Sequence, residues 1–349
     1  MKHALEQLLQ RQDLARAQAA DLLEAMASAT HEPAMAGAIL AALRLKGETP
    51  EEVAGFADAM RRLAVSPALT RSPEELVDIV GTGGDSSCSH NLSTGAALLA
   101  ASCGLRVAKH GNRAISSACG SADVLRALGL PLPLTGPAVA ECLERTGFTF
   151  LFAPDYHPAM AALAPVRRAL GVRTIFNMLG PLTNPARPAF GVIGCYSEAA
   201  ARTMAAALSG LEISRYFVIH GAAGWDEPTP VGPFLLLDAR PGAVLEGTRD
   251  PASYSLPPCA PEDLRGGGPE FNAAAMRAAL SGAPGPLADA LVLGAALALE
   301  VAGRAAGPAQ AAHLARSAIA DGRAAATVEA LSASGRQPAG TPGQGGPRA

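Results

Sequence analysis

The sequence predicts an α/β protein in which a run of helices precedes a domain built on a central sheet that contains parallel strands. Residues 1 to about 70 carry only helical patterns, and from residue 76 onward short apolar strands alternate with glycine turns and helices. This alternation is typical of a parallel sheet. The chain has 349 residues, of which 49% are hydrophobic, 17% are charged and 4% are aromatic. It is therefore long enough for one large domain or two.

The N-terminal helices are indicated by apolar side chains that share a helical face. The first two sets are Leu5, Leu8 and Leu9, and Leu22, Leu23 and Met26. Another helix is expected to begin at the stretch TPEE, residues 49–52. There the threonine can cap the helix, the proline fits the first turn, and the second glutamate completes a capping box.

In the following part of the chain, strands are expected at residues 76–80, 105–111 and 216–221. Helices are expected over residues 121–129 and 289–303. The segment 157–171 also has a helical pattern and could rejoin the N-terminal helices. The tail 334–349 is rich in Gly and Pro and has no periodicity, so we expect it to be disordered.

The composition argues against several classes of protein. The net charge of -3 gives no reason to expect nucleic acid or an anionic membrane surface as a partner. No uncharged apolar run approaches the ~20 residues that span a bilayer, and the amphipathic N-terminus lacks the apolar core of a signal peptide. The six cysteines form no CxxC pair and no Cys/His metal spacing, which suits reduced thiols. We expect a cytoplasmic protein.

The stretch IVGTGGDSSCSHNLSTGAALLAA, residues 79–101, joins a strand to a helix through glycine-rich backbone. Glycines let backbone N–H groups approach phosphate oxygens, and a helix N-terminus adds partial positive charge. Ser93 and Thr94 can cap the helix and offer hydroxyls to a phosphate or a metal. The pattern is not a P-loop and only weakly supports a dinucleotide fold. A tight turn with an N-cap is the alternative interpretation.

The stretch AKHGNRAISSACGSAD, residues 108–123, follows the next strand and is basic, glycine-containing and rich in serine. Lys109 alone could be a solvated surface lysine, and His110 alone could be a histidine of the core. Their clustering beside a second glycine loop favours an oxyanion-binding loop.

After a later strand, the stretch HGAAGWDEPTP holds the adjacent acids Asp226 and Glu227. An acidic pair alone is common on protein surfaces. Beside two phosphate loops, however, hard oxygen ligands suit Mg²⁺, which keeps waters and bridges to substrate phosphates. Asp85 and Ser93 are further oxygen donors.

Arginines are concentrated in residues 152–186, which contain Arg167, Arg168 and Arg173. An arginine fork is the favoured partner of a planar carboxylate. His157 at the start of this helical piece is equally compatible with capping or packing.

Together these motifs resemble those of the anthranilate phosphoribosyltransferases, which join anthranilate to phosphoribosyl pyrophosphate in tryptophan biosynthesis. The matching stretches lie between about residues 35 and 330 and are KGETPEEVAGFADAM, GTGGD, NLST, KHGNR, GSADVL, FLFAPDYHPAM, PVRRALG, RTIFNMLGPLTNP and GWDE. The resemblance implies a helical bundle of residues 1–72, joined by the segment at about 155–185. It also implies a larger α/β domain of residues 73–333 with a mixed, largely parallel sheet flanked by helices, and a homodimer formed through the bundle.

The resemblance also implies a role for each matching position. Phosphoribosyl pyrophosphate would be bound by Gly81, Gly84, Asp85, Ser89, Asn91, Leu92, Ser93, Thr94, Lys109, His110, Gly111, Asn112, Arg113, Ala114, Ile115, Ser116, Ser117 and Ser121. Anthranilate would contact Gly81, Asn112 and Arg167. Two Mg²⁺ ions per subunit would be held by Ser93, Asp226 and Glu227. Lys109, Asp226 and Glu227 would be catalytic, because pyrophosphate leaves readily only when its charge is neutralised.

Two other functions belong to the same fold superfamily. A pyrimidine nucleoside phosphorylase would use similar loops for inorganic phosphate, and a non-catalytic relative would bind nucleic acid. The KHGNR loop and the acidic pair favour the transferase over the first, and the net charge of -3 disfavours the second.

Four residues depart from the family pattern: His90, Cys88, Cys119 and Trp225. We expect these departures to affect loop dynamics and affinity rather than the reaction.

Overall fold

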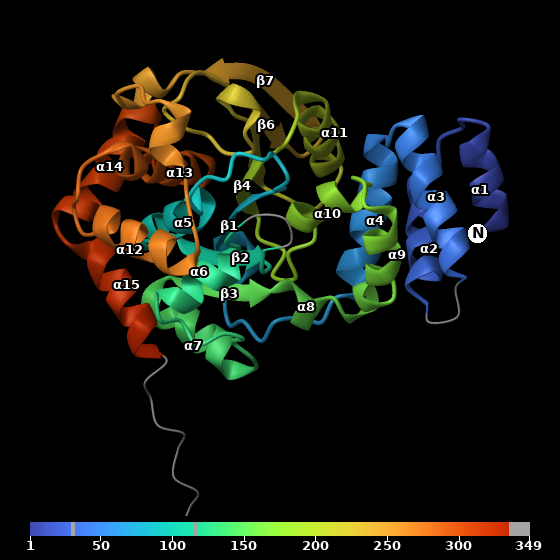
Figure 1. The fold of residues 1–349 in the computed structure, drawn as a ribbon, viewed down its shortest axis with the longest axis horizontal. Helices are drawn as coiled ribbons and strands as arrows, with labels where there is room; N and C mark the ends of the chain where they lie inside the picture. The colour runs from blue at the N-terminus through green and yellow to red at the C-terminus, as the bar shows by residue number, and fades with distance from the viewer. Residues whose placement is uncertain (29–31, 115–117, 335–349) are drawn as a thin grey trace, which may run out of the picture.

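The computed structural model describes residues 1–28, 32–114 and 118–334, and places a small helical bundle beside a larger α/β domain (Figure 1). The expectations for Ile115, Ser116 and Ser117, and for the tail at 335–349, lie outside the described residues. Within the described ranges, no helix is long and apolar enough to cross a membrane.

The bundle is built from the N-terminal helices and one later helix. These are α1 (Lys2–Leu9), α2 (Arg16–Ala27), α3 (Pro33–Lys46), α4 (Pro50–Leu63) and α9 (Ala164–Leu170). Thr49 caps α4 as predicted: its Oγ1 accepts the N–H of Glu52 at 3.3 Å, and the Glu52 carboxylate accepts the N–H of Thr49 at 2.9 Å. The segment expected to be helical from residue 157 is divided into a 3₁₀ turn, Pro158–Ala161, and α9, which packs against α3.

A seven-stranded sheet forms the centre of the α/β domain. Its strands are β1 (Leu76–Gly81), β2 (Arg106–Gly111), β3 (Phe148–Phe152), β4 (Phe190–Gly194), β5 (Arg215–His220), β6 (Phe234–Arg240) and β7 (Ala243–Arg249). They lie in the order β3-β2-β1-β4-β5-β6-β7. The first five are parallel, and β6 and β7 add antiparallel pairs at one edge. The predicted mixed, largely parallel sheet is confirmed.

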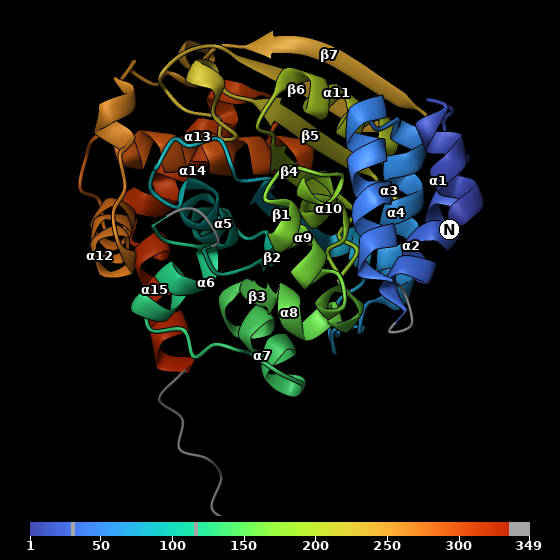
Figure 2. The same ribbon diagram turned by 45° about the vertical axis from the view of Figure 1, so that its right-hand side comes forward.

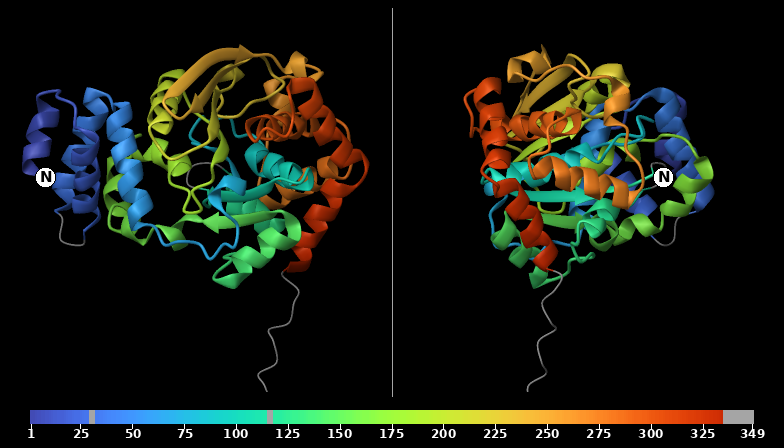
Figure 3. Two further views of the ribbon diagram at one scale, coloured as in Figure 1. Left: turned by 180° about the vertical axis from the view of Figure 1, so that it is seen from behind. Right: turned by 60° about the vertical axis from the view of Figure 1, so that its left-hand side comes forward.

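Helices cover both faces of this sheet. The remaining helices are α5 (Leu92–Ser102), α6 (Ser121–Ala127), α7 (Pro137–Thr146), α8 (Ala153–Tyr156), α10 (Phe176–Leu182), α11 (Glu198–Ser209), α12 (Pro269–Leu280), α13 (Pro286–Val301), α14 (Pro308–Ala320) and α15 (Arg323–Ser334). The bundle and helices α12 to α15 lie at opposite sides of the molecule (Figure 3), and α10 lies between the sheet and the bundle (Figure 2).

The buried apolar side chains form two cores, one on each face of the sheet. Along β5, Phe217 and Ile219 belong to the core with α5 and α13, whereas Tyr216 and Val218 belong to the core shared with α11 and the bundle. This alternation follows from the two-residue period of a strand. The bundle is therefore packed onto one face of the sheet through a continuous core.

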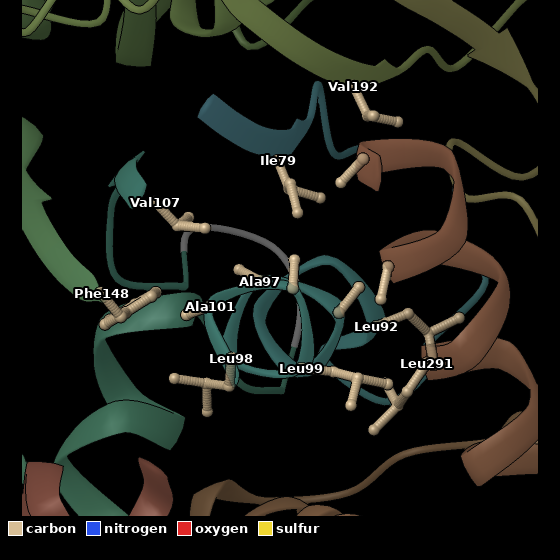
Figure 4. Packing of buried hydrophobic residues seen from close by; sticks show 14 of the residues in the cluster. Ile79, Leu92, Ala97, Leu98, Leu99, Ala101, Val107, Phe148, Val192 and Leu291 are labelled. Carbon is tan, nitrogen blue, oxygen red and sulfur yellow. The ribbon is translucent and has the colours of Figure 1, made fainter. Parts of the chain in front are cut away.

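Small residues bring α5 close to α13. A Cβ atom at Gly95 would lie 2.6 Å from Leu291 Cδ2, and one at Gly294 would lie 2.6 Å from the Cβ of Ala96. In Figure 4, Ala97 of α5 lies beneath Ile79 of β1, and Leu99 points toward Leu291 of α13. This packing holds the N-terminus of α5 beside the carboxyl end of β1.

Candidate active site

The three loops singled out in the sequence leave the sheet at one edge. They follow Gly81 in β1, Gly111 in β2 and His220 in β5, and these strands run in the same direction. Ligands of open α/β sheets bind in the crevice at the carboxyl ends of the strands.

The acidic pair reaches this edge because glycines lie at the ends of three strands. A Cβ atom at Gly81 would lie 2.5 Å from Asp226 Oδ2. One at Gly194 would lie 1.5 Å from the carbonyl oxygen of Asp226, and one at Gly221 would lie 2.1 Å from that of Glu227. Real Cβ contacts are never this short, so any larger residue would displace the acidic segment.

Asp226 is joined to the glycine loop after β1. Its Oδ2 accepts the N–H of Gly83 at 2.5 Å, and its own N–H donates to Asp85 Oδ2 at 3.1 Å. Gly83 and Gly84 have φ angles of +68° and +78°, which glycine adopts without strain. The turn therefore points the N–H of Gly83 at a carboxylate, whereas the glycine spacing was expected to present backbone N–H groups to a phosphate.

Glu227 occupies the N-terminus of α5. Its Oε1 accepts the N–H of Ser93 at 3.2 Å, where the helix dipole favours negative charge. The helix begins at Leu92 and has no side-chain cap from its own N-cap residue, Asn91. The expectation that Ser93 and Thr94 cap this helix is therefore wrong, because both lie inside its first turn.

Burial makes both acids costly to ionise. Burial, followed by the charges of Glu227 and Asp85, raises the pKa of Asp226 well above its usual range. Burial also raises the pKa of Glu227, to about 7, although Lys109 opposes this shift. A site that holds two such groups together favours a bound cation.

Lys109 lies beneath this pair and is not the solvated surface lysine considered above. Its side chain is 1% exposed, and its Nζ donates to the carbonyl oxygen of Ile79 and to Ser93 Oγ, the latter at 3.4 Å. Burial lowers the pKa of Lys109, and the charges of Asp78, Glu227 and Asp226 oppose this effect.

Asp78 and Asn184 support this lysine and were not nominated from the sequence. Asp78 Oδ2 accepts from Asn184 Nδ2 at 2.8 Å, and Asp78 Oδ1 accepts the N–H of His110 at 3.4 Å. Burial raises the pKa of Asp78 to about 6, and Lys109 opposes the shift. The only sequence signal for Asp78 was an aspartate inside an otherwise apolar strand.

The second loop is closed at its base by Asp123. Its Oδ2 accepts the N–H groups of Ala114 and Gly120, both at 3.0 Å. The two loops also meet directly, because Thr94 Oγ1 donates to Ser121 Oγ at 3.1 Å. The structure thus joins the segments that follow the two glycine loops through Thr94 and Ser121.

Comparison with known proteins identifies related chains. Residues 73–325 match the a/b domain of a glycosyl transferase family, and residues 2–64 match its helical bundle domain. The anthranilate phosphoribosyltransferase of Methylobacterium nodulans is 46% identical over 91% of this chain and 94% of that protein. The enzyme of Desulforudis audaxviator is 45% identical over 93% of each chain.

The chain belongs to the anthranilate phosphoribosyltransferase family.

Solved structures of this family share its fold. The crystal structure from Thermus thermophilus superimposes with a TM-score of 0.89 at 43% identity, covering 96% of this chain and 99% of that one. The Saccharomyces cerevisiae enzyme in complex with phosphoribosyl pyrophosphate and Mg superimposes with a TM-score of 0.85 at 25% identity, covering 95% and 97%. The family resemblance seen in the sequence is confirmed.

Some nominated residues have surroundings that the sequence did not reveal. Leu92 is 2% exposed, and its side chain belongs to the core. The Arg113 guanidinium lies over Phe152, 5.3 Å from the ring centroid. Arg173, which was noted but not nominated, donates to the carbonyl oxygen of Gly84 in the first loop.

A second group of side chains lies beside the loop after β2. His110 Nδ1 contacts the carbonyl oxygen of Gly180 at 3.2 Å, and its ring is 5.1 Å from that of His157. Burial lowers the pKa of His110 to about 3 and that of His157 to about 4. Both rings are therefore neutral at pH 7, and the Nε2 atom of each is buried without a partner in the described part of the chain.

Arg167 of α9 projects over Phe176 of α10, with its guanidinium 5.0 Å from the ring centroid. Burial lowers the pKa of Arg167. Within residues 1–28, 32–114 and 118–334, no carboxylate forms an ion pair with it. It is a half-buried cation available to an anionic ligand.

Proposed function

We propose that the chain transfers the 5-phosphoribosyl group of phosphoribosyl pyrophosphate to the amine of anthranilate, at the carboxyl edge of β1, β2 and β5. The products would be N-(5-phosphoribosyl)anthranilate and pyrophosphate, in tryptophan biosynthesis. The observation that carries the proposal is the acidic pair beside buried Lys109: Asp226 is bonded to the loop after β1, and Glu227 is bonded to the N-terminus of α5.

The two loops would bind phosphoribosyl pyrophosphate. The residues proposed for this role are Gly81, Gly84, Asp85, Ser89, Asn91 to Thr94, Lys109 to Ser117 and Ser121. Support comes from the hydrogen bond between Thr94 and Ser121 and from the positive φ of Gly83 and Gly84, which lets the backbone of the first loop turn tightly beside a ligand. Leu92 would contribute through its backbone.

Ser93, Asp226 and Glu227 would hold Mg²⁺, with two ions per subunit. No cluster of three or more His, Cys, Asp or Glu side chains suited to a metal is found among the described residues. Two buried carboxylates and a hydroxyl nevertheless form an all-oxygen set, which fits an ion that keeps several waters and takes further ligands from substrate phosphates. The raised pKa values of both carboxyls indicate the same need for positive charge. When bound, Mg²⁺ would neutralise the charge on the departing pyrophosphate.

Lys109 would add a fixed positive charge beneath the leaving group. Its position is set by Ile79, Ser93 and the Asp78 carboxylate, so little reorganisation is required during the reaction. The aromatic amine of anthranilate is weakly basic, and we propose no general base. Catalysis would then rest on positioning and on leaving-group stabilisation.

Arg167 would bind the carboxylate of anthranilate, with Gly81 and Asn112 as further contacts. The position of its guanidinium over Phe176 supports this role, as does the lack of a carboxylate ion-paired with it in the described part of the chain. A Saccharomyces cerevisiae relative has been solved with 4-fluoroanthranilate, at 25% identity and a TM-score of 0.84.

The experiment that tests the proposal follows the loss of anthranilate fluorescence after addition of phosphoribosyl pyrophosphate and Mg²⁺. The expected result is a Mg²⁺-dependent decay that is slowed in Arg167→Ala and in the double variant Asp226→Asn with Glu227→Gln. A wild-type protein that binds phosphoribosyl pyrophosphate but leaves anthranilate unchanged would disprove the proposed acceptor.

We also propose that the bundle forms a homodimer interface. Leu9 of α1 is 60% exposed and Leu45 of α3 is 76% exposed, and these two helices pack together. Light scattering of the Leu9→Lys, Leu45→Lys double variant should show a monomer, whereas the wild type should have twice that mass.

A further inference from the structure

A relay of two side-chain amides links α12 to both phosphate loops. Asn272 is 1% exposed, and its Nδ2 donates to Asn91 Oδ1 at 3.0 Å. Asn91 Nδ2 in turn donates to the carbonyl oxygen of Cys119 at 3.0 Å. Asn91 ends the first loop and Cys119 lies in the second, so a single relay joins three segments that are distant in the chain.

The direction of the relay is set by the backbone before α12. Asn272 Oδ1 accepts the N–H of Gly267 at 2.8 Å, so its amide nitrogen must face Asn91. The same backbone segment is bonded to the first loop, because the N–H of Gly266 donates to the carbonyl oxygen of Cys88 at 2.8 Å. A Cβ atom at Gly266 would lie 2.5 Å from the carbonyl oxygen of Ser89, so the two segments are in close contact. Asn272 is therefore bonded to a backbone segment, Gly266 and Gly267, that is itself in contact with the first loop.

At the other end, the relay holds the second loop close to its base. Cys119 precedes Gly120, whose N–H is bonded to Asp123. A Cβ atom at Gly120 would lie 2.2 Å from the backbone nitrogen of Ala114, so the two ends of the loop are tightly packed against each other. A change in the position of Cys119 would therefore move the point at which the loop enters α6.

We propose that Asn272 is a positioning residue, which acts through Asn91 to hold the two loops at the separation that phosphoribosyl pyrophosphate requires. This inference rests on the proposed function, in which both loops bind that substrate. Asn272 itself does not touch the substrate. Two of the residues that depart from the family pattern lie at the relay: Cys119 accepts from it, and His90 stacks on Phe271, the neighbour of Asn272, with ring centroids 5.6 Å apart.

The first test is Asn272→Asp, which keeps the acceptor for the Gly267 N–H but turns a carboxylate oxygen toward Asn91 Oδ1. Loss of one buried hydrogen bond should raise the Kd for phosphoribosyl pyrophosphate with Mg²⁺ about tenfold by calorimetry. The KM for this substrate should rise by the same factor. The KM for anthranilate and kcat should stay within about twofold of wild type, because the relay does not reach Arg167 or the acidic pair.

A matched control separates positioning from loss of helix stability. Ala279 also lies in α12 and is 4% exposed. Ala279→Gly should also lower the Tm, because it removes a buried methyl group and introduces a residue of poor helix propensity, but it should leave the Kd for phosphoribosyl pyrophosphate unchanged.

A double-variant cycle shows whether Asn272 acts through Asn91. If it does, Asn272→Ala should have almost no further effect on the Kd in an Asn91→Ala background. Fully additive effects, or a wild-type Kd in both Asn272 variants, would overturn the proposal while leaving the proposed function intact. Failure of the wild type to bind phosphoribosyl pyrophosphate at all would overturn both.

Discussion

Because Gly194 has no side chain, the backbone of the acidic pair Asp226 and Glu227 can lie against the end of β4. Gly194 ends β4, and a Cβ atom there would lie 1.5 Å from the carbonyl oxygen of Asp226. The neighbour is backbone and cannot move aside as a flexible side chain can. The position of the acidic pair therefore depends on a residue that has no functional group of its own.

Replacing this glycine tests that account. Gly194→Ala should shift Asp226 and Glu227 by about 1 Å and lower kcat/KM by about two orders of magnitude, since misplacement of this size is costly in catalysis. Gly247→Ala is the control, because a Cβ atom at Gly247 in β7 has nothing within 4 Å. Equal activity in the two variants, measured by the fluorescence assay, would contradict the explanation.

The raised pKa of Asp78 leads to a second prediction, which concerns the pH dependence of stability. Burial raises its pKa to about 6 from an ordinary value of 3.8, so the folded protein keeps this proton at a pH where the unfolded chain has lost it. The contribution of Asp78 to the free energy of unfolding therefore falls as pH rises from about 4 to about 6, by at most ~1.4 kcal/mol per pH unit. Urea denaturation at several pH values should show that this slope is reduced in Asp78→Asn. Identical slopes in the two proteins would disprove the assignment.

At the scale of elements, the contact between α5 and α13 determines where the helix N-terminus meets the acidic pair. Both helices carry a glycine at the crossing, and each glycine faces a side chain of the other helix. The hydrophobic residues around them are fully buried. A close crossing of this kind leaves no room for an additional methyl group.

Two Gly→Ala substitutions should therefore have opposite signs. At Gly294, the new Cβ would lie 2.6 Å from the Cβ of Ala96, which has no rotamer to change, so we expect a loss of about 1–3 kcal/mol. At Gly37 in α3, the new Cβ would meet Val166 at 3.8 Å, an ordinary contact, so the gain in helix propensity should stabilise the fold by about 0.5–1 kcal/mol. Denaturant unfolding measures both, and stabilisation by Gly294→Ala would show that the crossing is looser than described.

For the whole molecule, the important feature is that the bundle and the sheet share a core. Residues of β4, β5 and β6 pack with α11 and with the N-terminal helices. Arg16 of α2 also donates to the carbonyl oxygen of Gly210 at 2.8 Å, just after α11. A ligand bound at the carboxyl edge of the sheet should thus affect the stability of the entire chain.

Substrate and metal should consequently stabilise the molecule jointly. Phosphoribosyl pyrophosphate with Mg²⁺ at 100 times the Kd should add about 2.7 kcal/mol to the free energy of unfolding and raise the Tm. In EDTA the same substrate should add much less, and the double variant Asp226→Asn with Glu227→Gln should lose the effect of Mg²⁺. An equal rise in Tm with and without the metal would argue against the proposed metal ligands.

The three strands expected from the sequence correspond to β1, β2 and β5, each followed by a glycine turn. β3, β4, β6 and β7 were not located beforehand. β3 follows α7 after a single glycine, and β4 is a five-residue strand with glycine at its second and last positions, so neither has a strong periodic signal.

Helix capping also shows the limit of local patterns. Thr49 caps α4 as predicted, but at α5 the distant carboxylate of Glu227 accepts the backbone N–H that Ser93 and Thr94 were expected to cap.

The sequence by itself determined the fold class, the helical start of the chain, the three loops that follow β1, β2 and β5, and the family, because these depend on local spacing and on ordered motifs. Only the tertiary structure decided that Lys109 is buried, that Glu227 occupies the N-terminus of α5, and that Asp78, Asn184 and Asn272 support the site. The physical reason is that burial and hydrogen bonding between residues up to 181 positions apart depend on how the strands are ordered in the sheet and how the helices cross. Neither the strand order nor the helix crossings can be read from a local sequence pattern.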